Sequence, residues 1–116
     1  MYQIEIKNNP YYEENFIIDN QVYKLIFKWN ERVKFWSFEM QTNDNEDIIK
    51  TFLVLNCNLL KFVQSNKKPD GFLLVLPLSD NVKEITQNNV STDIGIFYLT
   101  KQELLEDPDW QNLNIF

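Results

Sequence analysis

Residues 22–29 read VYKLIFKW and residues 35–40 read FWSFEM. In both segments large apolar side chains occupy every second position, which is the period of an extended strand. The intervening residues Asn30–Lys34 are polar and have the length of a hairpin loop. We therefore predict a long antiparallel hairpin with one side facing the core.

Apolar runs outside the hairpin predict further strands. Ile48–Leu55 follows the acidic, amide-rich stretch Asn43–Asp47, whose short side chains suit a turn. Phe72–Leu78 lacks alternation and therefore predicts a central strand covered on both faces. It follows Pro69-Asp70-Gly71, a turn in which proline presets φ and glycine tolerates the exit geometry. A further strand is predicted at Ile94–Tyr98.

Three segments near these strands complete the prediction of secondary structure. Tyr2–Lys7 alternates and is a candidate strand, with its partner in this chain or in a neighbouring one. Leu59–Val63 is compatible with a short strand or one helical turn. Thr100 and Glu103 have the spacing of a capping box, so a short helix should begin there and stop before Pro108.

These elements predict a mainly β fold, a small antiparallel barrel or sandwich of about six to seven strands with one short C-terminal helix. Two glycines and four prolines leave no flexible linker, so residues 1–116 form a single domain. Residues 1–14 and 106–116 are candidate interaction arms. The core should consist of inward-facing strand residues, namely Tyr23, Leu25, Phe27, Trp29, Trp36, Phe38, Leu74, Leu76, Ile96 and Tyr98.

Charge and hydropathy exclude several classes of partner. The chain has 11 basic and 17 acidic side chains and a net charge of −6, which repels nucleic acid phosphates. The basic residues are scattered, so no cationic surface for anionic lipid is predicted. The longest apolar run is far shorter than the roughly 20 residues that a membrane-spanning helix needs. The first residues lack a secretory signal pattern, so we expect folding in a cytoplasm.

The residues that most enzymes need are missing. There is no histidine and one cysteine, Cys57, which removes the common nucleophile pairs and zinc sites. Gly71 and Gly95 are too far apart for a nucleotide-binding loop. The turn Asn43–Asp47 lacks the central glycine and distal glutamate of a calcium loop. We predict a protein without catalysis, cofactor or metal, in which Cys57 is a small buried apolar residue.

Within the two candidate arms, the aromatic residues outside the predicted strands are Tyr11, Tyr12, Trp110 and Phe116. Aromatic side chains in irregular end segments either pack on their own core or anchor another protein. Both readings remain open, and these residues are the candidate protein interface.

The sequence also resembles the bacteriophage baseplate plug family of contractile tails, from about Phe16 to Glu103. The resemblance rests on the order and spacing of short segments: Asp19–Tyr23, Trp29-Asn30, Trp36 with Phe38, Leu59-Leu60, Gly71–Leu73, Asp93–Gly95, Tyr98–Thr100 and Glu103. The chain departs from the pattern at Asn56–Asn58, where relatives carry glycine or proline.

The resemblance implies a structural virion protein at the centre of the baseplate, near the end of the tail tube. It implies contacts with hub and tail-tube proteins in several copies, in a phage or phage-tail-like particle whose proteins are made in a bacterial cytoplasm. The alternative from a different class is a stand-alone small-ligand or carbohydrate-binding barrel in which Trp29 and Trp36 flank a pocket.

Overall fold

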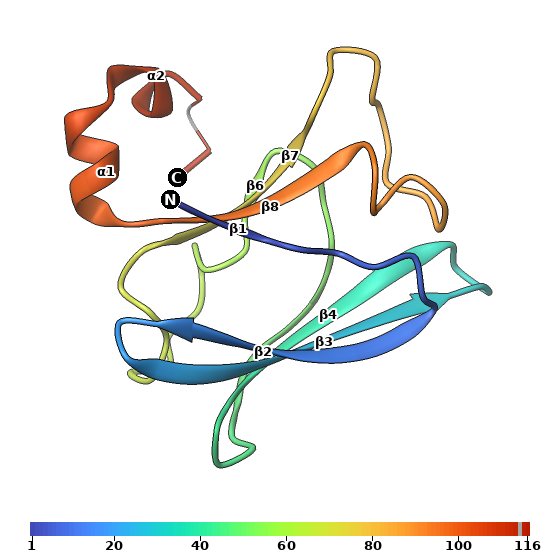
Figure 1. The fold of residues 1–116 in the computed structure, drawn as a ribbon, viewed down its shortest axis with the longest axis horizontal. Coiled ribbons are helices and arrows are strands. Elements are labelled where there is room, and N and C mark those ends of the chain that lie inside the picture. The colour runs from blue at the N-terminus through green and yellow to red at the C-terminus, as the bar shows by residue number, and fades with distance from the viewer. Residues whose placement is uncertain (114) are drawn as a thin grey trace.

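The computed structural model describes residues 1–113 and 115–116. In this part of the chain two four-stranded antiparallel sheets pack as a sandwich, and two short helices follow (Figure 1). The elements are β1 (Tyr2–Ile4), β2 (Tyr11–Ile18), β3 (Gln21–Asn30), β4 (Phe35–Thr42), β5 (Asp47–Phe52), β6 (Cys57–Asn58), β7 (Phe72–Pro77), β8 (Ile94–Leu99), α1 (Lys101–Glu106) and α2 (Pro108–Gln111). The predicted mainly β fold with antiparallel pairing is confirmed, and the architecture is a sandwich and not a closed barrel.

The first sheet has the order β2-β3-β4-β5 and contains the predicted hairpin. β3 and β4 pair so that Phe27 lies opposite Phe38 and Trp29 lies opposite Trp36. The side chains of Phe27, Phe38 and Trp36 are fully buried on the inner face. The alternation seen in the sequence is therefore the alternation of inward and outward side chains.

Strand β2 is the main element that the sequence pattern does not predict. Tyr11–Ile18 pairs along its whole length with β3, whereas residues 11–14 were expected in an irregular arm. The two strands are joined by Asp19 and Asn20, which have φ values of 51° and 64°. Positive φ at both central residues is typical of a type I′ hairpin turn, which asparagine and aspartate tolerate.

The second sheet has the order β1-β8-β7-β6, and β7 lies inside it as predicted. Leu73, Leu74 and Val75 of β7 are inaccessible to solvent, which explains the absence of alternation in this run. β1 pairs with β8 of its own chain, which answers the question of its partner. Residues 59–62 form turns, and no residue of 59–63 belongs to a strand or an α-helix.

The chain crosses between the two sheets at residues 53–56. Strand β5 ends at Phe52, earlier than predicted, and the Leu53 amide donates a hydrogen bond to the Trp36 carbonyl over 2.9 Å. The Asn56 amide then donates to the Val75 carbonyl of the other sheet over 2.7 Å. Asn56 has a φ of 57°, in the left-handed region that glycine and asparagine tolerate.

Two local predictions need correction. Gly71 does not have a positive φ; a Cβ atom there would lie 2.4 Å from the Leu99 carbonyl oxygen and 2.6 Å from the Tyr98 ring, so close packing requires glycine. The capping box of Thr100 and Glu103 is present and α1 ends before Pro108. A second helix nevertheless follows, because Pro108 occupies a first-turn position that proline favours, with Asp107 as the N-cap.

None of the helices in the described part of the chain has the length and apolar character needed to cross a membrane.

Candidate protein interface

The ten residues predicted for the core lie at two levels of burial. Eight are buried, namely Tyr23, Leu25, Phe27, Trp36, Phe38, Leu74, Ile96 and Tyr98. Trp29 and Leu76 are half-buried near the ends of their strands. The indole N–H of Trp29 donates to the Glu31 carboxylate over 2.6 Å, whereas that of Trp36 donates to the Thr86 carbonyl over 3.0 Å. Trp36 therefore links the first sheet to the loop between β7 and β8.

Of the two tyrosines in the candidate interface, Tyr12 belongs to the core. Its ring stacks on Phe27 with centroids 4.8 Å apart, and its hydroxyl accepts a hydrogen bond from the Lys7 amide over 2.8 Å. Burial raises the pKa of the Tyr12 phenol above its ordinary value. Tyr11 points to the other face, where it is exposed and donates to Glu13. Of the two readings left open for Tyr12, the structure shows packing on its own core, because β2 begins at residue 11 and its side chains alternate between the two faces.

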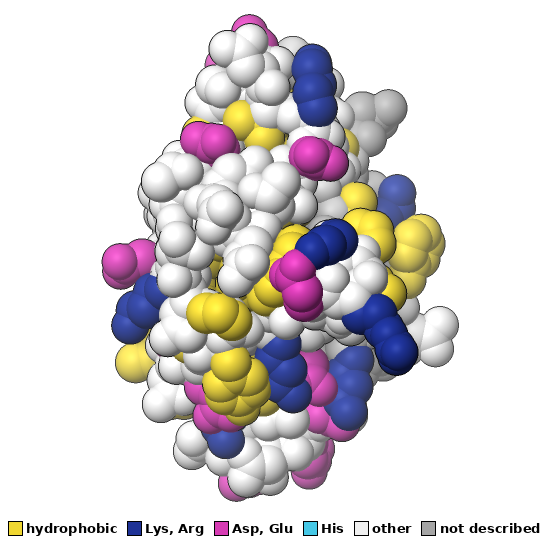
Figure 2. Space-filling model, turned by 90° about the vertical axis from the view of Figure 1, so that its right-hand side faces the viewer, with side chains coloured by type: hydrophobic (Ala, Val, Ile, Leu, Met, Phe, Trp, Pro, Cys, Tyr) yellow, Lys and Arg dark blue, Asp and Glu magenta, His cyan; other side chains and the backbone are white. Residues whose placement is uncertain are grey.

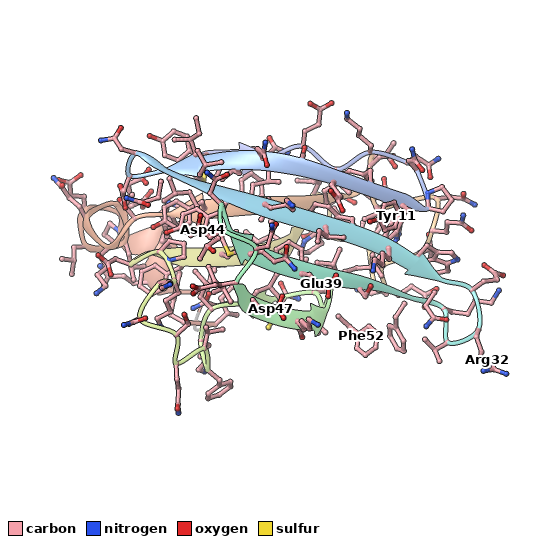
Figure 3. All side chains as sticks on the ribbon, turned by 90° about the horizontal axis from the view of Figure 1, so that it is seen from below. Tyr11, Arg32, Glu39, Asp44, Asp47 and Phe52 are labelled. Atoms are coloured by element: carbon pink, nitrogen blue, oxygen red, sulfur yellow. The ribbon has the colours of Figure 1, made fainter. Side chains whose placement is uncertain are left out.

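The two aromatic residues of the C-terminal segment are half-buried and lie far from Tyr11. Trp110 is part of α2, and the Phe116 ring packs edge-on against Phe72 with centroids 4.9 Å apart. The helices and Tyr11 are at opposite ends of the molecule (Figures 1 and 3). The four predicted residues therefore do not form one patch.

The outer face of the first sheet carries a ladder of polar side chains. Glu39 lies 3.7 Å from Lys28 and 3.6 Å from Lys50 on the two neighbouring strands. Gln41 donates to Asp47 over 2.9 Å. Figure 3 shows Glu39 between Tyr11 and Asp47 on this face. Because these polar groups pair with one another, the centre of the outer face offers little to an apolar partner.

Exposed apolar side chains instead gather at one end of this sheet. We call Val33, Phe35, Phe52, Val54 and Leu78 the apolar rim; each exposes between 46% and 53% of its surface. The rings of Phe35 and Phe52 touch, with centroids 5.6 Å apart. Around the β3–β4 turn and the β7–β8 loop, Figure 2 shows hydrophobic side chains among charged ones. Exposed apolar patches bordered by charges are typical of protein contacts.

Two grooves adjoin at Val54. The larger, about 920 Å³, is lined by Val33, Phe35, Leu78 and the loop that contains Val82 and Ile85. The smaller, about 460 Å³, runs beside β5 and is bordered on its other side by Phe62 and Val63. Phe62 is 86% exposed. The sequence analysis missed this surface, and the only signal was the outward register of Phe52 and the undecided conformation of residues 59–63.

The described residues offer no candidate site for catalysis or metal binding. They contain no group of three or more metal-ligating side chains. At the acidic turn, Asn45 accepts from Lys24 over 2.7 Å and Glu46 pairs with Lys67. Neither Trp29 nor Trp36 lines the two grooves, so the geometry does not favour the alternative of a ligand pocket between them. Cys57 is half-buried in the smaller groove.

Comparison with known proteins gives one family. A family model described as the cyanophage baseplate Pam3 plug gp18 matches residues 1–103, which contain both sheets and the start of α1. No curated protein matches the chain.

Proposed function

The chain belongs to the cyanophage baseplate plug family and thus has a structural role in a phage baseplate; we propose that it acts at the central hub, next to the end of the tail tube. In this proposal the whole chain, residues 1–116, works as a single domain. It binds hub and tail-tube proteins through packing of surfaces, in several symmetric copies. The particle is a phage tail or a related tail-like particle.

The observation that carries the proposal is the apolar rim with its two adjoining grooves. About half of each rim side chain is exposed to water, and burial of apolar surface against a partner contributes roughly 25 cal/mol per Å². The rim, both grooves and the sandwich beneath them lie inside the family-matched residues 1–103. The candidate docking surface therefore lies in the part of the chain that matches the family.

A structural role also agrees with the rest of the surface. Family membership suggests a protein without enzymatic activity. A stiff β body can position neighbours by shape alone, because side chains packed at crystal-like density resist deformation. We propose residues 106–116, which follow the family-matched part, as an additional arm, with Trp110 and Phe116 as its anchors.

The test is fractionation of tail particles from cells that produce the phage or tail-like particle. Tail tubes and baseplates are separated, and the proteins of each fraction are quantified by mass spectrometry. We expect this chain in the baseplate fraction at a fixed ratio to hub proteins, and cross-links from Lys34 or Lys83 beside the large groove to hub or tube proteins. Absence of the chain from purified baseplates would refute the proposal.

A further inference from the structure

Strand β5 is an edge strand of the first sheet, so its backbone is paired with a neighbouring strand on one side only. It pairs with β4 so that Thr51 lies opposite Phe38 and Lys50 lies opposite Glu39. The Leu53 amide donates a hydrogen bond to the Trp36 carbonyl, so the amides of β5 that point toward β4 are those at every second residue from Leu53. Since bonded and non-bonded pairs alternate in an antiparallel ladder, the amides of Lys50 and Phe52 point away from β4. Figure 3 shows β5 at this edge of the sheet, between Asp47 and Phe52.

A groove beside this edge strand is lined mainly by uncharged residues. The smaller groove follows the strand, with residues 48–52 on one side and Phe62 and Val63 on the other. Among its described lining residues Lys50 is the single charged side chain. Phe62 has 86% of its surface in water, so an occupant of the groove would cover a large aromatic ring.

The other edge strands are either short or carry a charged side chain that points inward. β1 has three residues and β6 has two. β2 has eight residues, but Glu14 lies opposite the fully buried Leu25 and therefore points inward. An inward charge on an edge strand discourages a further strand from pairing there. β5 carries no inward charge, because Ile49 and Thr51 occupy its inner positions opposite Met40 and Phe38.

We propose that β5 accepts an extended segment of a neighbouring baseplate protein as a fifth strand of the first sheet. The segment bonds to the Lys50 and Phe52 backbone, packs apolar side chains at every second position under Phe62, and places a carboxylate near Lys50. The inference rests on the proposed function and names the type of contact that this surface makes.

The chemistry of β5 favours a different protein over a second copy of this chain. A symmetric pair of β5 strands centred on residue 50 would place two lysines opposite each other, and like charges in that position are destabilising. Lys50 is at present shared between Glu39 at 3.6 Å and Asp47 at 3.5 Å. An acidic residue on the incoming strand would join this existing network.

Backbone-specific variants in the particle-producing strain test the proposal. Lys50→Pro removes an amide hydrogen that does not bond to β4, and proline is tolerated at such edge positions. Lys50→Gln keeps that amide, and Leu105→Ser alters a side chain on α1 that is 77% exposed and does not line the groove. We expect Lys50→Pro and Phe62→Ser to be incorporated into baseplates at about one tenth of the wild-type level. This corresponds to an increase of about tenfold in the dissociation constant. Lys50→Gln keeps the amide but loses the charge, so it should enter less well than the wild type and better than Lys50→Pro, whereas Leu105→Ser should enter at wild-type level.

Purified Lys50→Pro must keep the melting temperature of Lys50→Gln, so that loss of incorporation reports binding. Hydrogen exchange of the wild-type chain gives a readout without substitution. The Lys50 and Phe52 amides should exchange rapidly in the free chain and slowly in isolated baseplates, while the Thr51 amide is protected in both. If they stay rapid in baseplates that contain the chain, or if Lys50→Pro is incorporated normally, the inference is wrong although the proposed function stands. If wild-type baseplates lack the chain, the proposed function itself fails.

Discussion

At the scale of single residues, the inner face of the first sheet could be predicted and its exceptions could not. Phe27, Trp36 and Phe38 are buried where the two-residue period places them. Tyr12 and Glu14 follow the same period on β2, but their neighbours include too few apolar residues to reveal a strand. Pairing with β3 imposes the strand, and this long-range effect leaves no local mark in the sequence.

Trp36 is the largest fully buried side chain and bonds to the loop that contains Thr86. Trp36→Ala should lower the free energy of unfolding by about 3 to 5 kcal/mol through loss of packing and formation of a cavity. Phe35→Ala, the neighbouring exposed position, should cost less than about 1 kcal/mol. Urea unfolding followed by circular dichroism measures both. Equal losses would mean that the side chain at position 36 is not in the core.

Glu14 is an inward carboxylate with a buried oxygen, Oε1, that has no hydrogen-bond partner among the described residues. Burial raises the pKa of Glu14, and Lys7 opposes this in part. Because the pKa is higher in the folded state, the stabilising contribution of the protonated form is present below the unfolded value of about 4.3 and is lost as pH rises through the folded value.

Glu14→Gln should therefore raise the melting temperature at pH 7, and the gain should disappear near about pH 3, where the native carboxyl is protonated. Glu13→Gln, on the exposed face of the same strand, is the matched control and should change stability little at either pH. Thermal melts of the three proteins at both pH values provide the measurement. A Glu14→Gln protein that is less stable than the wild type at pH 7 would contradict this account of the burial.

At the scale of elements, sequence signals with a local mechanism succeed. The capping box at Thr100 and the hairpin loop before Phe35 depend on nearby side chains, and both are present. Residues 59–63 could not be assigned because Asn58, which is buried, determines their path. Its side-chain oxygen accepts hydrogen bonds from Leu60 and from the distant Leu73, each over 3.1 Å.

The turn between β2 and β3 offers a prediction at this scale. Asn20 has a φ of 64°, and alanine in the left-handed region costs about 1 kcal/mol. Asn20→Ala should lower stability by about that amount, whereas Asn20→Gly should leave it unchanged or raised, since glycine adopts positive φ freely. Chemical denaturation of the two variants distinguishes them, and equal stability would argue against a type I′ turn.

At the scale of the whole molecule, the sequence predicts the fold class but not the arrangement of the two sheets. Which strands become edge strands depends on how residues 53–56 cross from β5 to β6. The exposed rim and the groove beside β5 follow from that crossing. Because this crossing depends on long-range packing, the sequence pattern did not indicate the rim or the groove.

Buried tyrosines give the folded molecule a predicted alkaline limit. Burial raises the pKa of Tyr98 to about 12, against an ordinary value near 10, and raises that of Tyr12 as well. With folded values above unfolded ones, the phenols contribute stability that is complete below about pH 10 and is lost as pH rises towards 12 and beyond. Melting temperature should fall over this interval, and less steeply in a Tyr12→Phe, Tyr98→Phe double variant. A parallel fall in both proteins would assign the loss to other groups.

The central claim is that this sandwich is a structural protein of the baseplate that acts through its shape and its exposed edge strand, β5. The most direct measurement is a cryo-electron microscopy map of the intact baseplate. We predict density for the unaltered two-sheet body on or near the tail axis, in several symmetric copies, with neighbouring chains against the apolar rim. A complete map of the baseplate without this body, or with the rim facing only solvent, would contradict the account.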